Sequence, residues 1–280
     1  PDFKGLSQTQ IGVRTLRQPV VENLFTFIAS SNNNIKRITM LMEKFCTRYG
    51  QKIETEKGDF YTFPSIQTVA QDQDIEQTMQ GLGFGYRAKY YAKTIEYLMR
   101  MGDPDEYLHK LRVEPLEIAR GELIKLSGVG PKVADCVLLM SLDKSDAVPV
   151  DTHIWQVAQR RYVGRLADSS SNSTDMLLPP GKDEQIRQLA RQLRAFKTPS
   201  TKAYELAQSL IVMLFGPYAG WAQGMLFSGD LKNGVDTAAA KPKPTKRKAQ
   251  QPPAATLTES ALGSATPEPR RAGLRRRPYP

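Results

Sequence analysis

Apolar residues recur at helical spacing through almost all of the segment from residue 20 to residue 236, and this periodicity limits the fold more than any other feature. Strand signals are scarce in the same segment. The periodicity and its flanking glycines, prolines and polar caps predict helices at 20–29, 34–49, 64–70, 75–80, 86–101, 115–126, 131–142, 152–162, 183–196 and 202–215. We therefore expect an all-α core over residues 20–236.

Two segments break the helical pattern. Residues 167–182 form a polar insertion that contains SSSNST and two consecutive prolines, which is typical of a loop. Residues 237–280 hold too few large apolar side chains to build a core, so we expect a disordered basic tail. This tail has ten Lys and Arg against two Glu, and so carries +8 of the net charge of +10. The helical core must therefore be assigned by its motifs and not by its charge.

Composition excludes several classes of protein. The two cysteines, Cys46 and Cys136, cannot form a disulfide framework or a four-cysteine metal cluster, and both lie in apolar helical runs typical of buried thiols in a reducing compartment. No apolar stretch reaches the roughly 20 residues that span a bilayer, so we expect no membrane contact. These features predict a soluble intracellular protein.

The run LSGVGPKVADCVLLM, at 126–140, carries the strongest chemical signals. Its segment from Ser127 to Gly130 joins two helical runs, and Gly128 and Gly130 permit backbone conformations that a side chain would block. The result would be a hairpin of two helices over 115–142. Its second helix would point free N–H groups outward, which suits a phosphate. A tight helix connection without a ligand is the alternative that the glycines alone would favour.

Lys132 lies in the first turn of that second helix, where the positive end of the helix dipole disfavours a cation. Lys132, Cys136 and Met140 follow one another at i, i+4 and i+8, so the lysine is aligned with apolar neighbours. Both features favour an amine nucleophile, and a solvated surface lysine is the alternative. Asp151, in AVPVDTHIW, suits a helix N-cap that would hold its carboxylate rigidly, where it could stabilise a cationic sugar. His153 is either a surface or core histidine or a phosphate contact.

These runs belong to a recognisable pattern. GVGPKVADC followed by VPVDTHIW closely resembles the eukaryotic 8-oxoguanine DNA glycosylases, within the superfamily of helix-hairpin-helix glycosylases. The runs SSNNNIKRI, LGFGYRAKYY and GPYAGWAQGMLFSGDL extend the resemblance over roughly 25–231. It implies a helix-hairpin-helix (HhH-GPD) core at 20–236. It also implies that residues 1–19 are a residual linker from an N-terminal domain that precedes Pro1.

The resemblance implies a bifunctional DNA glycosylase and AP lyase that excises 8-oxoguanine opposite cytosine from duplex DNA in base excision repair. Lys132 would attack the sugar C1′ and displace the damaged base, and the resulting Schiff base would undergo β-elimination. Asp151 would stabilise the transition state, and His153 would contact a backbone phosphate. No metal or organic cofactor is implied, because a lysine and a carboxylate suffice for this chemistry.

The resemblance also assigns residues to the extruded nucleotide and its partner strand. Asn32 would fill the space that the damaged nucleotide vacates, and Tyr86 would wedge into the base stack. Arg37 and Arg87 would hold the orphaned cytosine through its acceptor edge. A polar helix cap and the start of an amphipathic helix would explain these residues equally well without the catalytic hairpin.

The base pocket, by the same resemblance, would use Phe227 and Cys136 to sandwich the purine. Gln223 would hydrogen-bond the pairing edge of the base, and Met140 would line the cavity. Gln223 and Phe227 are spaced i, i+4 and so share one helix face. Side chains of these types at helical spacing also occur as ordinary core residues.

Three alternative functions fit the sequence less well. A glycosylase with an iron–sulfur cluster is excluded because two cysteines cannot supply four thiolates. A monofunctional alkylbase glycosylase has no use for Lys132, and a non-enzymatic DNA-binding module leaves the pairing of Lys132 with Asp151 unexplained. The basic runs KPKPTKRK and RRAGLRRR in the tail predict a nuclear protein, with a mitochondrial form as the alternative. A monomer is the default expectation.

Overall fold

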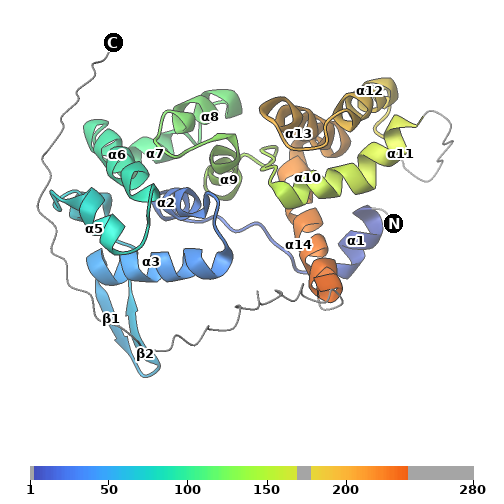
Figure 1. Cartoon of the computed structure of the whole chain (residues 1–280). Helices are drawn as coiled ribbons and strands as arrows, with labels where there is room; N and C mark the ends of the chain where they lie inside the picture. The colour runs from blue at the N-terminus through green and yellow to red at the C-terminus, as the bar shows by residue number, and fades with distance from the viewer. Residues whose placement is uncertain (1–2, 169–177, 239–280) are drawn as a thin grey trace, which may run out of the picture. The chain divides into compact units, whose positions relative to one another are not determined.

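The computed structural model describes residues 3–168 and 178–238, with side chains up to Asp230, and all of them lie within one compact unit, Pro1–Ala240. Most of the predicted polar insertion and nearly all of the predicted basic tail lie outside the described residues. The described part is almost entirely helical (Figure 1), as the apolar periodicity predicts. Its helices fall into two groups, each around its own apolar cluster.

The first cluster contains the hairpin that the sequence singles out. Its centre is aromatic, because Phe25, Phe45, Phe84 and Tyr91 are fully buried there. The Tyr91 hydroxyl donates to the carbonyl of Phe25 at 2.6 Å, so that its one polar atom has a partner inside the core. The helices of this group are α2 (Val20–Ser30), α3 (Ile35–Tyr49), α4 (Ile66–Val69), α5 (Ile75–Gly81), α6 (Arg87–Arg100), α7 (Pro104–Lys110), α8 (Leu116–Ile124) and α9 (Pro131–Ser141).

The second cluster is built from the later helices together with the start of the chain. Helix α1 (Phe3–Thr9), which the sequence analysis did not predict, packs on α14, and the ring of Phe3 lies 4.8 Å from that of Phe215. A π-helical turn at Gln159–Val163 interrupts the single helix predicted for 152–162. The helices of this group are α1, α10 (Thr152–Ala158), α11 (Gly164–Ala167), α12 (Asp183–Arg194), α13 (Thr201–Phe215) and α14 (Ala219–Ala238).

The connector between α9 and α10 passes from one cluster to the other. Ala147 is buried in the first cluster and Val148 in the second. Helix α14 holds this connector closely, because the Gly220 N–H donates to the Ser145 carbonyl at 2.8 Å. A Cβ on Gly220 would lie 2.3 Å from the Ala147 carbonyl oxygen, so only glycine fits there. The residues just before Asp151 are therefore fixed against both groups of helices.

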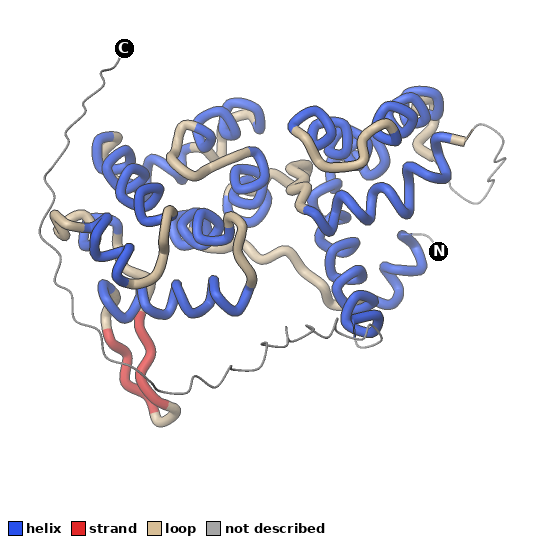
Figure 2. The backbone as a smooth tube through the Cα atoms, in the orientation of Figure 1, coloured by secondary structure: helices blue, strands red, loops and turns tan. Residues whose placement is uncertain are grey.

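A two-stranded antiparallel hairpin interrupts the helices after α3. Strands β1 (Lys52–Thr55) and β2 (Gly58–Tyr61), red in Figure 2, pair so that Ile53 lies opposite Phe60. The sequence pattern indicates no strand here, because four-residue strands are too short for a clear alternating pattern. Gly58, with φ of +119°, supplies the turn conformation that the hairpin needs.

The segment Thr201–Asp230 is by length and composition apolar enough to cross a membrane, which the sequence analysis did not anticipate. In the structure Leu210, Ile211 and Leu226 from this segment are buried in the second cluster. A short 3-10 turn at Gly216–Tyr218 also divides it into two helices. The segment thus serves as a core element of this unit.

Candidate active site

The turn between α8 and α9 is the hairpin that the glycines predict. Gly128 has φ of +82°, and a Cβ there would lie 2.7 Å from the Tyr90 ring, so the backbone passes directly over an aromatic face of α6. The Thr94 hydroxyl, also on α6, donates to the Ser127 carbonyl at 2.9 Å. Helix α6 therefore holds the turn in one conformation.

The first turn of α9 has no side-chain cap. Gly130 is the N-cap residue, with extended φ of −96° and ψ of 179°, and no side chain among the described residues caps the first N–H groups of the helix. A Cβ on Gly130 would meet no atom within 4 Å, so the protein itself does not require glycine there. Open space and uncapped N–H groups together suit the approach of an anion.

Lys132 is the second residue of α9 and is half-buried. Its Nζ lies over the ring of Phe27, 4.6 Å from the ring centroid, in a cation–π contact. Phe27 belongs to α2, which packs on α9. The amine is thus held on an aromatic face and is not extended into solvent.

Asp151 caps the next helix, as the sequence predicts. Its Oδ1 accepts a hydrogen bond from the Ile154 N–H at 2.8 Å, and its backbone is extended at the start of α10. The side chain is half-buried. Capping fixes the orientation of the carboxylate and leaves its second oxygen for other partners.

Both of these residues affect the pKa of one buried thiol. Cys136, one turn after Lys132, is buried, and burial raises the pKa of its thiol to about 11. The nearby Lys132 amine opposes this rise in pKa, whereas the charge of Asp151 adds to it. The charges of Lys132, Asp135 and Asp151 thus all act on the pKa of this thiol. The other cysteine, Cys46, was also predicted to be buried but is only half-buried on α3.

The predicted base-binding residues are divided between the two apolar clusters. Gln223 is buried on α14, and Phe227 is half-buried one turn further along. The His153 ring meets the Phe227 ring edge to face at 5.8 Å between centroids. Met140 packs on the first cluster, where the Gln18 amide contacts its sulfur at 3.8 Å. His153, Gln223 and Phe227 thus share the α10–α14 side of the site.

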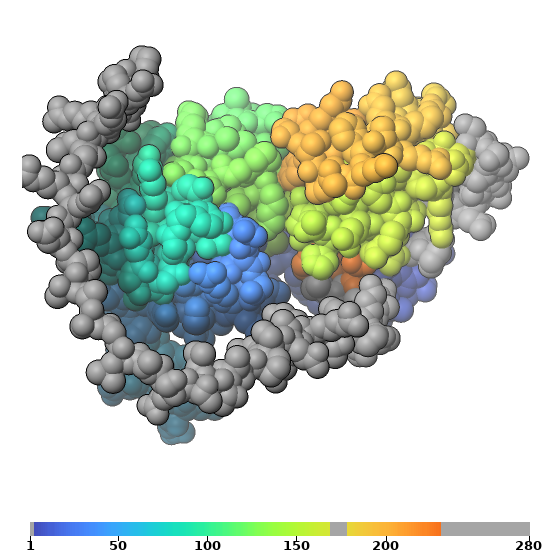
Figure 3. Space-filling model, viewed as in Figure 1, coloured from blue at the N-terminus to red at the C-terminus, as the bar shows by residue number. Residues whose placement is uncertain are grey.

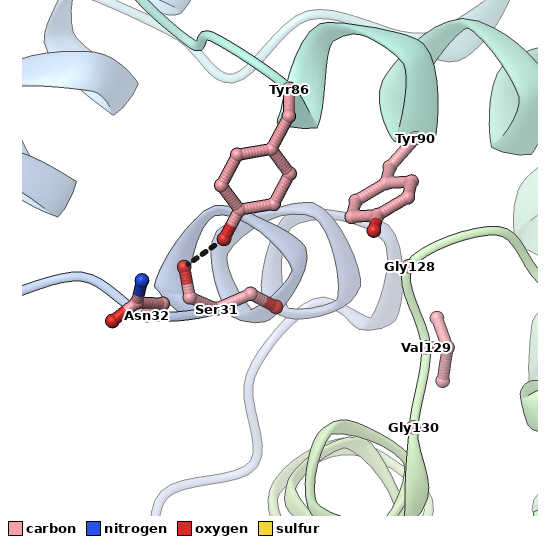
Figure 4. Close-up of a pocket in the computed structure, with 7 residues that line it drawn as sticks. All are labelled: Ser31, Asn32, Tyr86, Tyr90, Gly128, Val129 and Gly130. Carbon is pink, nitrogen blue, oxygen red and sulfur yellow. Dashed lines mark hydrogen bonds between the residues drawn. The ribbon is translucent and has the colours of Figure 1, made fainter.

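A cavity of about 350 Å³ lies beside the hairpin (Figure 4). Tyr86 and Tyr90 project into it from the start of α6, with the hairpin backbone beside Tyr90 and the turn after α2 beside Tyr86. The Tyr86 hydroxyl donates to the Ser31 carbonyl at 3.0 Å. Asn32 has φ of +46° and is exposed at the rim. The residues that line the cavity are Ser31, Asn32, Tyr86, Tyr90, Gly128, Val129 and Gly130.

The two arginines expected at the orphaned cytosine differ in their exposure and in their hydrogen-bond partners. Arg37 is exposed and donates to the Gly83 carbonyl at 3.1 Å. Arg87 is only 2% exposed, and its guanidinium donates to the carbonyls of Ser31, Asn32 and Phe84. Arg37 is therefore accessible to a nucleotide, whereas Arg87 in this conformation orders the turn that carries Asn32.

Sequence reasoning missed several residues of this site. Asp230 lies 3.9 Å from the His153 ring and forms an ion pair with Arg160. Its i, i+3 spacing from Phe227 could have suggested it, because the two share a helix face. Phe27 and Thr94 come from other helices, and no local pattern indicates their contacts. Among the described residues, no group of three His, Cys, Asp or Glu side chains could hold a metal ion.

Comparison with known families identifies the family to which this chain belongs. The model of a family described as "HhH-GPD superfamily base excision DNA repair protein" matches residues 25–180. The chain belongs to this superfamily. The match includes the hairpin, Lys132 and Asp151, and so confirms the family that the sequence motifs indicate.

Two proteins similar to this chain are both named N-glycosylase/DNA lyase. The chain is 37% identical over 233 residues to an Arabidopsis thaliana protein named N-glycosylase/DNA lyase OGG1, which covers 82% of this chain and 55% of the relative. It is 35% identical over 231 residues to the N-glycosylase/DNA lyase of Saccharomyces cerevisiae, covering 79% of this chain and 57% of the relative. The chain thus spans about half the length of the curated relatives it matches.

Two solved structures share the HhH-GPD architecture and are DNA complexes. MBOgg1 with a low-affinity DNA ligand has a TM-score of 0.65 and 27% identity, covering 83% of this chain and 66% of that chain. The 8-oxoguanine glycosylase/lyase of Clostridium acetobutylicum, solved with double-stranded DNA containing cytosine opposite 8-oxoguanine, has a TM-score of 0.62 and 25% identity. It likewise covers 83% of this chain and 66% of that chain.

Proposed function

We propose that this chain is the catalytic core of a bifunctional DNA glycosylase and AP lyase that removes 8-oxoguanine opposite cytosine from duplex DNA. The observation that carries this proposal is that the Lys132 amine lies on the Phe27 ring at the uncapped start of α9, while the cap bond to Ile154 fixes the Asp151 carboxylate at the start of the next helix. The names of the similar proteins, and the lesion in the Clostridium complex, support the proposed substrate.

Lys132 and Asp151 have different roles in the first step, in which the base is released. The neutral Lys132 amine attacks C1′, the C1′–N9 bond breaks, and its electron pair leaves with the base. The base takes up one proton, which balances the proton that the attacking nitrogen loses. The Asp151 carboxylate stabilises the positive charge that develops on the sugar, and its cap bond to Ile154 holds it in place.

The lyase step follows from the same covalent bond. The sugar ring opens to a Schiff base between Lys132 and C1′. Loss of a C2′ proton then expels the 3′ phosphate by cleavage of the C3′–O3′ bond. Water hydrolyses the imine and restores the Lys132 amine for another cycle.

The surrounding residues suit a flipped nucleotide. Gly128 and Gly130 leave the N-terminus of α9 open to a backbone phosphate. We infer that Asn32 and Tyr86, at the adjacent cavity, occupy the space in the duplex after extrusion, while the exposed Arg37 holds the cytosine. The buried Arg87 does not reach the cytosine in this conformation and instead orders the turn that carries Asn32. His153 contacts a phosphate, and Cys136, Met140, Gln223 and Phe227 enclose the base.

Borohydride trapping tests this proposal against a protein that only binds DNA. The chain is incubated with duplex containing 8-oxoguanine opposite cytosine, with undamaged duplex and with duplex containing an abasic site. A reduced covalent adduct on the damaged and abasic duplexes, absent from the undamaged one, is expected. Binding without any adduct on either substrate would show a non-enzymatic module.

The place of action in the cell is a separate part of the proposal. The names of the family and of its relatives indicate work on genomic DNA. The basic runs at 241–248 and 270–277 support a nuclear location. Microscopy of the fluorescently tagged chain, with and without residues 237–280, tests this. Signal outside the nucleus in the full chain would contradict the location, and nuclear signal that does not depend on the tail would contradict the role of the basic runs.

A further inference from the structure

Asp135 stands out from the other acidic residues of the described chain. It lies one turn after Lys132 on α9 and is fully buried. Its carboxylate accepts hydrogen bonds from Arg120 at 2.8 Å, from the Gln208 amide at 2.8 Å and from the Tyr204 hydroxyl. Burial raises the pKa of Asp135, and the hydrogen bonds from Tyr204 and Arg120 oppose the rise. These partners together satisfy a charge that would otherwise be costly to bury.

Two of these partners also contact the connector that leads to Asp151. The Tyr204 hydroxyl accepts a hydrogen bond from the Val150 N–H at 3.4 Å. The Gln208 amide donates to the Val148 carbonyl at 3.2 Å. Val150 immediately precedes Asp151, so the two side chains of α13 join the start of α10 to the carboxylate of Asp135.

This network crosses between the two apolar clusters. Helix α9 belongs to the first cluster, whereas α13 and the backbone at 148–150 belong to the second. In Figure 3 the surface of α8 and α9, in green, adjoins that of α13, in orange. The two catalytic residues therefore sit on different clusters. The side chains of Tyr204 and Gln208 connect the backbone segments that carry them.

We propose that Asp135, Tyr204 and Gln208 are positioning residues that fix the Lys132 amine relative to the Asp151 carboxylate. This inference rests on the proposed function. Its physical basis is that the network is attached one helical turn from the nucleophile and one residue from its carboxylate partner. A displacement of about 1 Å between reacting groups can lower a rate by about 100-fold. A loosened network should therefore slow the chemical step more than it weakens DNA binding.

The sharpest test is Tyr204→Phe, which removes one oxygen atom and with it the bonds to Asp135 and Val150. Its matched control is Tyr49→Phe, which removes a similar Tyr–Asp bond, of 2.6 Å to Asp72, within the first cluster and not between the two clusters. Three quantities are measured on the full chain: the rate of borohydride trapping on abasic duplex at saturating DNA, the Kd for duplex with an unreactive tetrahydrofuran site, and Tm.

We expect Tyr204→Phe to lower the saturated trapping rate by about 10-fold or more, with a Kd within about twofold of the unmodified chain. Tyr49→Phe should lower Tm comparably but leave the trapping rate unchanged. An unchanged rate in Tyr204→Phe, or an equal loss of rate in both variants, would overturn the proposal. If the unmodified chain forms no adduct, it is the proposed function that fails.

Gln208→Met provides a second variant if Tyr204→Phe does not fold. Met keeps the length of the side chain and leaves the Tyr204–Asp135 bond intact, but removes the bonds from the Gln208 amide to Asp135 and to the Val148 carbonyl. The positioning role predicts a slower saturated trapping rate here as well, by about threefold or more. A rate equal to that of the unmodified chain in a folded Gln208→Met variant would count against the role.

Discussion

The N-termini of α9 and α10, which carry Lys132 and Asp151, are capped in opposite ways. Helix α10 begins with Asp151, whose side chain caps the helix and accepts from Ile154. Helix α9 begins with Gly130, which provides no cap and leaves open space where a side chain would be. The capped end holds a charged group for chemistry, whereas the open end leaves backbone N–H groups for a ligand. The difference predicts separate consequences for substitutions at the two ends.

The largest effect is expected at the open end, from Lys132→Gln. Glutamine is of similar length but has no amine, so no Schiff base can form. We expect the borohydride adduct to fall by at least about 1,000-fold, while binding to undamaged duplex changes little. Lys125→Gln, on an exposed lysine of the same hairpin, is the control and should trap normally. Adduct formation that survives Lys132→Gln would place the nucleophile elsewhere.

At the capped end, Asp151→Asn removes the carboxylate charge but keeps a side-chain oxygen that can cap the helix. Asparagine can still accept from the Ile154 N–H, so Tm should stay close to that of the unmodified chain. Loss of the carboxylate charge should slow single-turnover base removal by about 100- to 1,000-fold. Asp151→Ala should show the same loss of rate and, in addition, about 1 kcal/mol less stability to urea unfolding. A normal rate in Asp151→Asn would reduce Asp151 to a helix cap.

The two glycines of the hairpin sharpen the comparison further. At Gly130 a methyl group meets no protein atom, so Gly130→Ala should leave Tm unchanged and weaken duplex binding by about 10-fold, by blocking a phosphate. Unaltered DNA affinity in Gly130→Ala would mean that no phosphate approaches this end of α9.

At Gly128 the positive φ and the Tyr90 ring oppose a side chain, so Gly128→Ala should lose about 1–3 kcal/mol of unfolding free energy.

The smallest effect is expected from Thr94→Val, which keeps the shape of the side chain but removes its bond to the Ser127 carbonyl. The loss of one buried hydrogen bond should lower the unfolding free energy by about 1 kcal/mol. The loosened hairpin should bind duplex about twofold more weakly, measured by fluorescence anisotropy. A stability loss with no change in affinity would show that the turn does not need α6 to present its N–H groups.

Local signals in the sequence predict the helices and both ends of the site. GVGPK places the turn, the open helix end and Lys132, and VPVD places the extended connector and the cap. Most observed helices agree with those expected, for example α9 at Pro131–Ser141 against 131–142, whereas α1, α7 and α14 lie outside the predicted ranges. These features depend on residues close together in the chain, where spacing and capping rules apply.

Features that depend on tertiary contacts could not be predicted in the same way. The burial of Arg87 results from carbonyls at the end of α2, which lie more than fifty residues away in the sequence. The network of Asp135 depends on Tyr204 and Gln208, whose separations from it are 69 and 73 residues. Such contacts require knowledge of how the two clusters pack together. The short β1–β2 hairpin could not be predicted for a different reason, because its strands are too short to show a periodic pattern.

The most direct test of the proposed chemistry is to identify the residue that bonds to DNA. The chain is trapped with borohydride on abasic duplex, digested with nuclease and trypsin, and the modified peptide is sequenced by mass spectrometry. We predict that the reduced sugar is attached to Lys132, within the peptide 126–144, because modification blocks cleavage after that lysine. Attachment to another lysine, or to the amino terminus of the chain, would contradict the assignment of Lys132 as nucleophile.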